Sequence, residues 1–423
     1  MNRIHYDNVY SATWWLCVVT LPFTILLNSF FIIVLTLVWL AEANFAEKWQ
    51  RLKKASWVWP FLFFFILHVI GLSYSDHIRD GFSEVEKKLS FLIIPLVAAS
   101  GRPLTKPSFD FLKKGFIYSC LVIVIISFIL TGVSVVTDSA RPLQNFDEQT
   151  SQQFHLLNPT ASSMGEYFSY IQLGDWIDIH PAYFSMYLIF CIAILAQGMF
   201  DQMKMNFFGL VVIALFTFFI VLLASRMAIV SYLVTTSYLA FYNVARKRNF
   251  MVILVPALFL LILCALIWIN PVSRFRIMQE PLHTSFHIDQ NKMEWNSVSF
   301  RLLEWKASLH ELGKSWLTGV GTGDGQAALQ NYYSTYNAST AGLKYNAHNQ
   351  YLQTALELGL VGLSLLLVCI FKPVFTIVQP FPIHIAFVII FGLMCLTESM
   401  LARQKGIVFF TMFQSLFFRY TAS

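Results

Sequence analysis

Long apolar stretches separated by short polar segments make up most of the chain. Roughly a dozen of them approach the length of about 20 residues that a transmembrane helix needs. The predicted spans are residues 10–26, 27–40, 56–72, 89–100, 115–136, 181–199, 207–224, 227–242, 250–270, 354–371, 382–396 and 407–418. Several are short, so their helices must extend into the flanking residues. The first two could instead form one long tilted helix.

Composition supports this pattern. Of all residues, 57% are hydrophobic and 12% are charged, and the mean hydropathy is +0.61; soluble domains carry about one-quarter charged residues. All 6 cysteines lie in apolar stretches without a CxxC pair, so we expect packing residues rather than disulfides or metal ligands. The sequence therefore predicts an all-α polytopic membrane protein of about twelve transmembrane helices, without a nucleic-acid partner.

Basic residues orient the predicted helices, because they concentrate in the even-numbered loops. These are Lys48, Arg51, Lys53 and Lys54 in the second loop, Arg102, Lys106, Lys113 and Lys114 in the fourth, and Arg246, Lys247 and Arg248 in the eighth. The positive-inside rule places these loops and both termini in the cytoplasm.

The odd-numbered loops are then external, and two of them are long. We expect residues 1–270 to form helices one to nine with a loop at about 137–180, residues 271–353 to form a helical external subdomain, and residues 354–423 to form the last three helices. The same parity places a set of unusual polar residues at the external face. They are Lys87, Lys88, His180, Arg226, Arg301, His348, Glu398 and Arg403.

Two arginines stand out among these residues. Arg226 lies between two apolar stretches, where a guanidinium is expensive, so it suggests an anionic partner. The alternative is an arginine that extends to the lipid headgroups. Arg301 lies in a predicted amphipathic helix that Asn296 or Ser297 can cap, and it could simply pair with Glu304 at i,i+3 spacing.

His348 lies in the polar segment that leads into the tenth span. Asn346 is a suitable N-cap, which would place His348 in the first helical turn, where free N–H groups favour an anion. Leu352, Ala355, Gly359 and Gly362 would share its helix face, and their small members permit close packing. A lone histidine is often structural, but this position favours a functional one.

Other polar motifs are weaker. The glycine-rich segment 318–326 lacks the Lys-Ser/Thr ending of a phosphate-binding loop and is predicted to be a turn, with Thr322 or Asp324 capping the next helix. His180 precedes Pro181, so it can simply start the sixth span. There is no HExxH motif or Cys/His cluster, and we expect neither a metal nor another cofactor.

Together these segments resemble one enzyme family. The segment "AHNQYLQTALELGLVG" (347–362) is similar to the His-Asn signature of the O-antigen ligase and O-antigen polymerase superfamily. "ASRMAIV" (224–230) and "FRLLEWKASLHELGKSWLTGVGTG" (300–323) resemble its two arginine-containing segments. "VEKKLSFLIIPLV" (85–97) and "LTESMLARQKGIVFF" (396–410) match its early lysine and late acidic segments more loosely.

The resemblance implies a C-type glycosyltransferase of the bacterial inner membrane with a periplasmic active site. The donor would be a glycan on undecaprenyl diphosphate, and the acceptor a sugar hydroxyl of lipid A-core or another glycan. Arg226 and Arg301 would stabilise the diphosphate without a metal, and His348 would act as base or orient the diphosphate. Lys87, Lys88 and Asn349 would add to donor binding, with His180, Glu398 and Arg403 at the rim.

Two other functions stay open. A polymerase would use the same donor to extend the lipid-linked chain, although the His-Asn segment and the glycines favour the ligase. A transporter of lipid-linked sugars would more typically show repeats and polar residues at the membrane midplane. A purely structural membrane protein would leave the two arginines unexplained.

Overall fold

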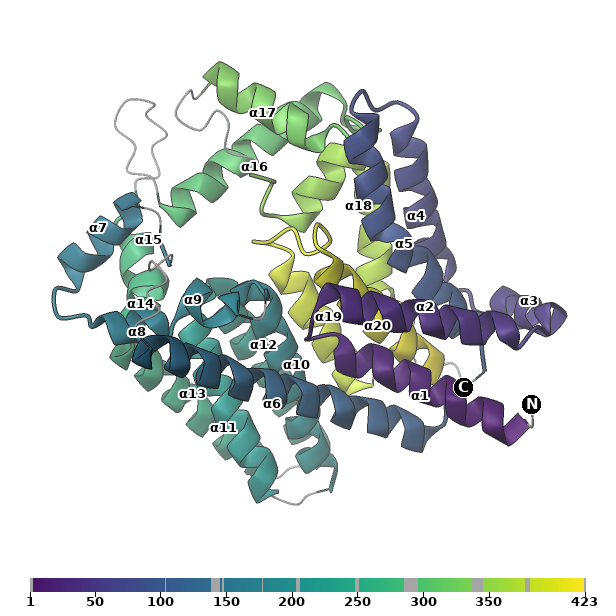
Figure 1. The fold of residues 1–423 in the computed structure, drawn as a ribbon, viewed down its shortest axis with the longest axis horizontal. Coiled ribbons are helices and arrows are strands. Elements are labelled where there is room, and N and C mark those ends of the chain that lie inside the picture. Colours follow the sequence, from purple (N-terminus) through teal and green to yellow (C-terminus); the bar gives the residue numbers. More distant parts are fainter. Residues whose placement is uncertain are drawn as a thin grey trace. The chain divides into compact units, whose positions relative to one another are not determined.

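The computed structural model describes residues 3–102, 104–137, 145–146, 148–176, 178–202, 206–247, 251–284, 296–336, 345–376 and 381–421, and all regular structure in these ranges is helical (Figure 1). The chain divides into two compact units. Unit 1 comprises Met1–Phe116, Arg301–His384 and Cys395–Ser423, and unit 2 comprises Ile117–Phe300 and Ile385–Met394. Residues 138–144, 285–295 and 337–344 of the predicted long external loops, and Arg248, lie outside the described residues.

The described helices are those of a polytopic membrane protein. Four of them are long and apolar enough to cross a membrane, and the number rises to six if each of two bent helix pairs forms one span. Three shorter apolar helices add to these. Many large hydrophobic side chains are exposed, among them Leu26, Phe207 and Leu261, as expected for a surface that faces lipid.

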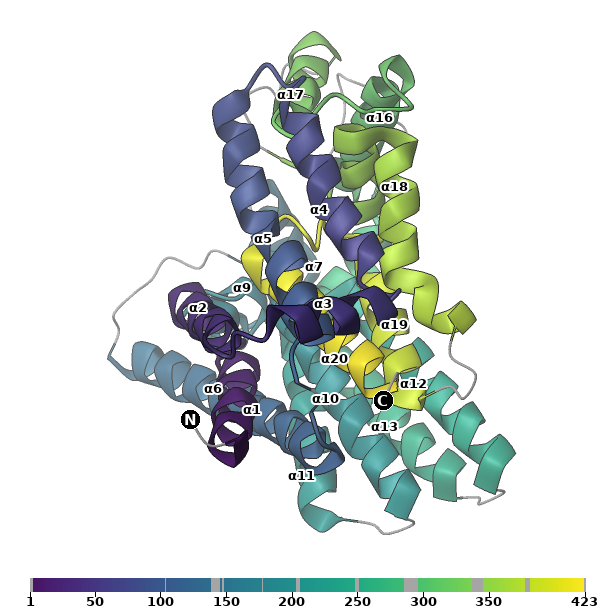
Figure 2. The same ribbon diagram turned by 90° about the vertical axis from the view of Figure 1, so that its right-hand side faces the viewer.

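Unit 1 is built around three adjacent helices, α4, α5 and α18, with α20 packed against α5 (Figures 1 and 2). Its helices are α1 (Arg3–Thr20), α2 (Ile25–Ala41), α3 (Phe45–Lys54), α4 (Trp59–Leu72), α5 (Ile78–Ser100), α17 (Gly325–Tyr336), α18 (Gln350–Thr376) and α20 (Gln404–Thr421). α6 (Lys106–Val136), α16 (Ser297–Lys314) and α19 (Pro382–Met394) run from one unit into the other. α1 and α2 are separate helices packed against each other, so a single long opening helix is wrong.

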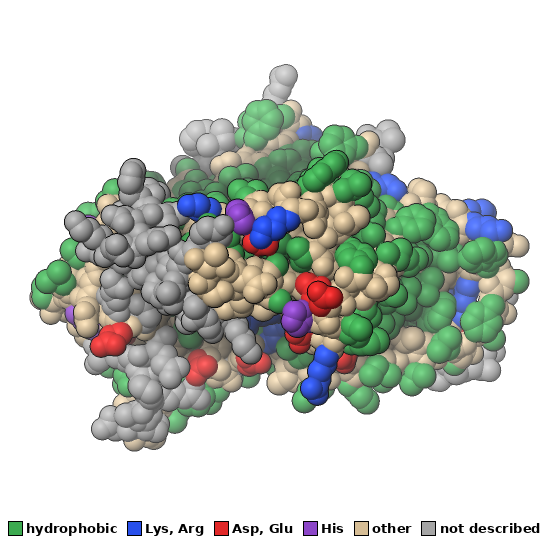
Figure 3. All heavy atoms as spheres, turned by 90° about the horizontal axis from the view of Figure 1, so that it is seen from above, with side chains coloured by type: hydrophobic (Ala, Val, Ile, Leu, Met, Phe, Trp, Pro, Cys, Tyr) green, Lys and Arg blue, Asp and Glu red, His purple; other side chains and the backbone are tan. Residues whose placement is uncertain are grey.

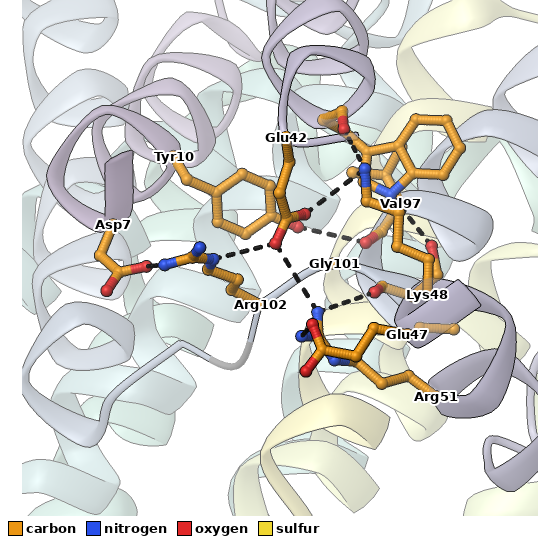
Figure 4. Close-up of polar contacts among 12 residues, drawn as sticks. Asp7, Tyr10, Glu42, Glu47, Lys48, Arg51, Val97, Gly101 and Arg102 are labelled. Carbon is orange, nitrogen blue, oxygen red and sulfur yellow. Dashed lines mark hydrogen bonds and ion pairs between the residues drawn. The ribbon is translucent and has the colours of Figure 1, made fainter. Parts of the chain in front are cut away.

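The second and fourth loops meet the N-terminal helix at one end of unit 1, which we call the basic end (Figure 4). The almost fully buried carboxylate of Glu42 lies 2.9 Å from Nε of Arg102 and 3.4 Å from Nζ of Lys48. Arg102 also pairs with Asp7 near the N-terminus, at 2.6 Å. Near the C-terminus, Arg419 donates to the carbonyl of Gly101 at 3.0 Å. The second loop, the fourth loop and both terminal helices therefore share one end, as the even-loop parity predicts.

The opposite end of unit 1 is formed by the turn between α4 and α5. α5 has 23 residues and therefore spans about 34 Å at 1.5 Å per residue, close to the roughly 30 Å of a bilayer core. The first residues of α5 lie beside the glycine-rich segment 319–325, and its last residues lie at the basic end. The two ends are therefore separated by about one membrane thickness.

The glycine-rich segment connects three parts of unit 1. The carboxylate of Asp324 accepts from the backbone N–H groups of Asp76 and His77 at 2.8 and 2.9 Å, so it binds the turn that leads into α5. The Thr322 hydroxyl donates to the carbonyl of His68. Asp324 directly precedes α17, and its carbonyl accepts from the N–H of Ala328, while the side chains of Asp324 and Thr322 bond to the α4–α5 turn and to α4. A side-chain cap of α17 by Asp324 or Thr322 stays a prediction.

α18 is interrupted at Gly359, whose φ of 63° and ψ of −165° are not helical. The backbone N–H of Leu360 bonds to the carbonyl of Trp316 at this break, and Gly321 N–H bonds to the carbonyl of Glu357. The break makes room for the glycine-rich segment beside α18. The predicted continuous face through Gly359 and Gly362 is therefore wrong.

We expect Gly359→Ala to destabilise the protein. A Cβ there would lie 2.1 Å from the carbonyl oxygen of Leu317, in a left-handed conformation that side chains disfavour. The strain alone costs about 1–3 kcal/mol. Gly313→Ala is the matched control, because a Cβ at this position in α16 meets no atom within 4 Å. The thermal midpoint of the detergent-purified variants measures this; equal midpoints would contradict the expectation.

Unit 2 packs α10, α11, α12 and α13 together. Its helices are α7 (Glu148–Leu157), α8 (Ser163–Tyr167), α9 (Tyr170–Asp175), α10 (Pro181–Gln202), α11 (Phe207–Leu223), α12 (Arg226–Lys247), α13 (Met251–Ile269), α14 (Pro271–Arg274), the π-helix η1 (Phe275–Gln279) and α15 (Glu280–Leu282). Phe154, Ala224, Val272 and Phe275 form a buried cluster beside the break between α11 and α12. This cluster fixes the start of α12, where Arg226 lies.

Candidate active site

His348 lies in a tight turn just before α18. The side chain of Asn349 accepts from the N–H groups of Tyr351 and Leu352 at 2.9 and 3.1 Å, so Asn349 is the N-cap of α18. Asn346 instead accepts from the N–H of His348 at 2.9 Å. The predicted cap at Asn346 is therefore wrong, and His348 precedes the helix. Its φ of 38° is unusual for a residue with a side chain, and such strain concentrates at functional sites.

The ring of His348 is bound by a buried acid. Its Nδ1 lies 2.9 Å from Oε2 of Glu304, whose side chain is 2% exposed. The His348 side chain is 29% exposed, so the ring combines a buried contact with access from outside. The sequence offered Glu304 only as a partner for Arg301. In the structure, Glu304 pairs with His348.

Arg301 lies one helical turn before Glu304 on α16. Its Nη2 is 2.7 Å from Oε1 of Glu398, and its Nε donates to the carbonyl of Thr397 at 3.2 Å. The start of this helix is capped as predicted, because Asn296 accepts from the N–H groups of Val298 and Ser299. The structure thus brings Arg301, His348 and Glu398, three of the predicted site residues, into one cluster.

The segment 395–401 holds this cluster in place. The backbone N–H of Gln350 donates to the carbonyl of Cys395 at 2.8 Å, and the side chain of Gln350 accepts from the N–H of Leu401 at 2.6 Å. The Ser399 hydroxyl bonds to the side chain of Asn346 at 3.2 Å. Hydrogen bonds therefore connect the late acidic segment to the His-Asn segment.

The charges around His348 set its protonation. Burial by itself lowers the pKa of His348, but the hydrogen bond and the charge of Glu304 outweigh it, and Glu398 adds to them, so the pKa lies above its ordinary value. For Glu304, burial is the largest effect and raises its pKa, although His348 and Arg301 act in the opposite direction. The imidazole of His348 therefore binds a proton more readily than a free histidine does.

Arg226 begins α12 in unit 2, where its charge is also paired. Its guanidinium lies 2.5 Å from Oε2 of Glu280, a carboxylate that is 0% exposed, and its Nε donates to the carbonyl of Arg276 at 2.6 Å. Oε1 of Glu280 accepts from the backbone and hydroxyl of Ser297. Glu280 is therefore an anionic partner of Arg226 within the chain. A contact with lipid headgroups is not needed to explain an arginine at this position.

A second arginine, Arg276, lies close to this pair. Its guanidinium stacks on the ring of Tyr170, with 3.6 Å from Cζ to the ring centroid, and its Nε donates to the carbonyl of Ala224. Neither Arg276 nor Glu280 is among the site residues predicted from the sequence. Both lie more than 45 positions from Arg226, and no local pattern connects them.

The other predicted site residues lie elsewhere. Lys87 and Lys88 both pair with Glu84, at 2.6 and 2.8 Å, within the first turns of α5. His180 starts α10, because its carbonyl accepts from the N–H of Tyr183 and Phe184. Arg403 has an exposed side chain, and its carbonyl begins α20.

On the face drawn in Figure 3, charged side chains of both signs occur side by side among hydrophobic ones, in keeping with the paired cations described above. Across the residues that the structure describes, no three His, Cys, Asp or Glu side chains form a group suited to a metal ion.

Comparison with known families matches the part of the chain that contains Arg226, Arg301 and His348. Residues 210–367 match the model of the O-antigen ligase family. The chain carries an O-antigen ligase domain. This ligase domain runs from α11 into α18 and contains Arg226, Arg301 and His348, whereas the residues predicted for the rim lie outside it. No curated protein matches the chain. The protein is accordingly an enzyme of glycan transfer of the O-antigen ligase or polymerase type.

Proposed function

We propose that the enzyme transfers a glycan from undecaprenyl diphosphate to a sugar hydroxyl of lipid A-core. The observation that carries the proposal is the cluster of Arg301, His348 and Glu398, because a permanent cation and an accessible imidazole of the ligase domain, Arg301 and His348, both belong to it. The His-Asn segment favours the ligase over the polymerase.

His348 acts as the general base in this reaction. The acceptor oxygen attacks the anomeric carbon of the donor sugar, and the bond from that carbon to the diphosphate oxygen breaks. The acceptor proton passes to Nε2 of His348, and undecaprenyl diphosphate leaves with the bonding electrons. Among the described residues, only Nδ1 of this ring has a hydrogen-bond partner, so Nε2 is available for the acceptor.

The ligase domain contains both arginines, and we propose that each stabilises the negative charge of the leaving diphosphate. A guanidinium carries five N–H donors in a planar fork, so one that already binds a carboxylate keeps donors for phosphate oxygens. The side chains of Arg226 and Arg301 are each 22% exposed. Each pairs with a less exposed acid, Glu280 for Arg226 and Glu398 for Arg301. Each acid fixes the direction of its arginine before the substrate binds, and a positioned cation needs little reorganisation as charge develops. Metal is then unnecessary for the leaving group.

We place this chemistry at the periplasmic face of the bacterial inner membrane, with about twelve spans and both termini cytoplasmic. The support is the separation of about one bilayer between the two ends of α5, with arginines and lysines gathered at the basic end. Lys87, Lys88 and Asn349 would add to donor binding, and His180, Glu398 and Arg403 would border the site.

A strain that lacks the gene tests the proposal. We expect lipid A-core without O-antigen, together with accumulated lipid-linked polymer, and both should be reversed by the wild-type gene. Core that carries a single repeat would instead identify a polymerase. Glycan that stays on the cytoplasmic leaflet would identify a transporter and contradict the proposal.

A further inference from the structure

We propose that Glu304 is a positioning residue that holds His348 in the tautomer and orientation needed to accept the acceptor proton. The inference rests on the proposed function, since it needs His348 to be the base. Glu304 touches no substrate in this scheme and acts only through the imidazole.

The contact between the two side chains is specific. A carboxylate oxygen is only an acceptor when ionised, so Oε2 of Glu304 at 2.9 Å from Nδ1 requires the proton on Nδ1. The lone pair of the neutral ring is then on Nε2, the atom that must take the proton. Without this acid, the neutral ring would divide itself between two tautomers, of which only one is a base at Nε2.

Both partners are held rigidly. Glu304 lies in the middle of α16, which begins at the Asn296 cap, and the side chain of Glu304 is 2% exposed. His348 lies in a turn fixed by Asn346 and Asn349 at either side. A carboxylate and an imidazole on two such supports keep one geometry, as a catalytic base requires.

The surrounding charges favour the protonated ring once transfer occurs. From α16, Glu304 and Arg301 face the imidazole; Glu398 comes from the segment after α19, and Tyr345 packs its ring 6.1 Å away. Arg301 opposes protonation, but its charge is paired with Glu398. Glu304 therefore supplies the charge in direct contact with the developing imidazolium.

The test compares Glu304→Gln with wild type in purified protein, using a lipid-linked glycan donor and lipid A-core as acceptor. We expect transfer to fall about 10- to 10³-fold, which is less than the roughly 10²–10⁴-fold loss expected when the general base itself is removed. Glu311→Gln is the matched control: Glu311 lies on the same helix and also pairs with a histidine, His310, at 3.0 Å. Its transfer should equal wild type.

The pH profile separates positioning from mere packing. Transfer requires neutral His348, so the wild-type rate falls as pH decreases through the raised pKa of this ring. Removing the Glu304 charge lowers that pKa, so the acidic limb of Glu304→Gln should move to lower pH, while the limb of Glu311→Gln stays in place.

Two results would overturn the inference. One is an unchanged rate in Glu304→Gln, and the other is a reduced rate with an unshifted acidic limb and an unchanged thermal midpoint. His348→Gln separates the inference from the proposed function. If that variant also transfers normally, the base role itself is wrong; if it is inactive while Glu304→Gln is normal, only the role of Glu304 fails.

Discussion

His348→Ala is expected to lower glycan transfer by about 10²–10⁴-fold, the range that a general base contributes. The acceptor hydroxyl would then have to lose its proton to water, with no group held beside it. The rate is measured with purified protein, lipid-linked donor and acceptor, and in cells by the loss of O-antigen from lipopolysaccharide.

His310→Ala is the matched control for this variant. His310 lies on α16 and pairs with Glu311 at 3.0 Å, but it is outside the cluster around Arg301. We expect it to transfer at the wild-type rate. His348→Ala leaves the buried Glu304 without its partner, so His348→Gln, which keeps a donor for that carboxylate, guards against loss through misfolding. Wild-type transfer by both His348 variants would contradict the base role.

Replacing either arginine by lysine should reduce transfer by about 10²–10³-fold, the loss seen when one preorganised donor to a developing anion is removed. Lysine keeps the charge next to Glu280 or Glu398 but lacks the planar fork, so Arg226→Lys and Arg301→Lys test the diphosphate role rather than the ion pair. The turnover rate should fall, because the diphosphate charge is greatest as it leaves.

Replacing an arginine by alanine would combine a loss of catalysis with a loss of stability. Arg226→Ala leaves the fully buried Glu280 unpaired, and breaking a buried pair costs about 3–5 kcal/mol. Lys306→Ala removes an exposed cation from α16 and serves as the control. If both lysine variants matched the control in turnover, the arginines would be structural residues only.

Much of the local architecture follows from the sequence. Apolar stretches predict the helices because lipid requires every backbone group to be bonded within a helix. The parity of the basic loops predicts that Arg102, Arg51 and Arg419 share one end. The ion pair of Arg102 with Glu42 and the hydrogen bonds of Arg51 and Arg419 to the carbonyls of Ser100 and Gly101 confirm it. The cap at Asn296 also follows from local chemistry.

The sequence could not supply the partners of the charged residues. The i,i+3 spacing on one helix makes Glu304 a possible partner of Arg301. In the structure Arg301 pairs with Glu398 of segment 395–401, and Glu304 pairs with His348. Similarly, the break at Gly359 depends on a backbone contact with Leu317 that no periodicity reveals. Pairings across long separations are set by tertiary packing, which local patterns do not encode.

Sidedness is the most direct test of the account, because the proposed roles of Arg226 and His348 each require a position on the periplasmic side of the membrane. Arg226→Cys and His348→Cys, each made in a protein whose 6 native cysteines are replaced, are treated in spheroplasts with a membrane-impermeant maleimide. Lys54→Cys marks the basic end. We predict that positions 226 and 348 react without detergent and that position 54 reacts only after the membrane is opened. Labelling of 226 and 348 from opposite sides would contradict the roles proposed for these two residues.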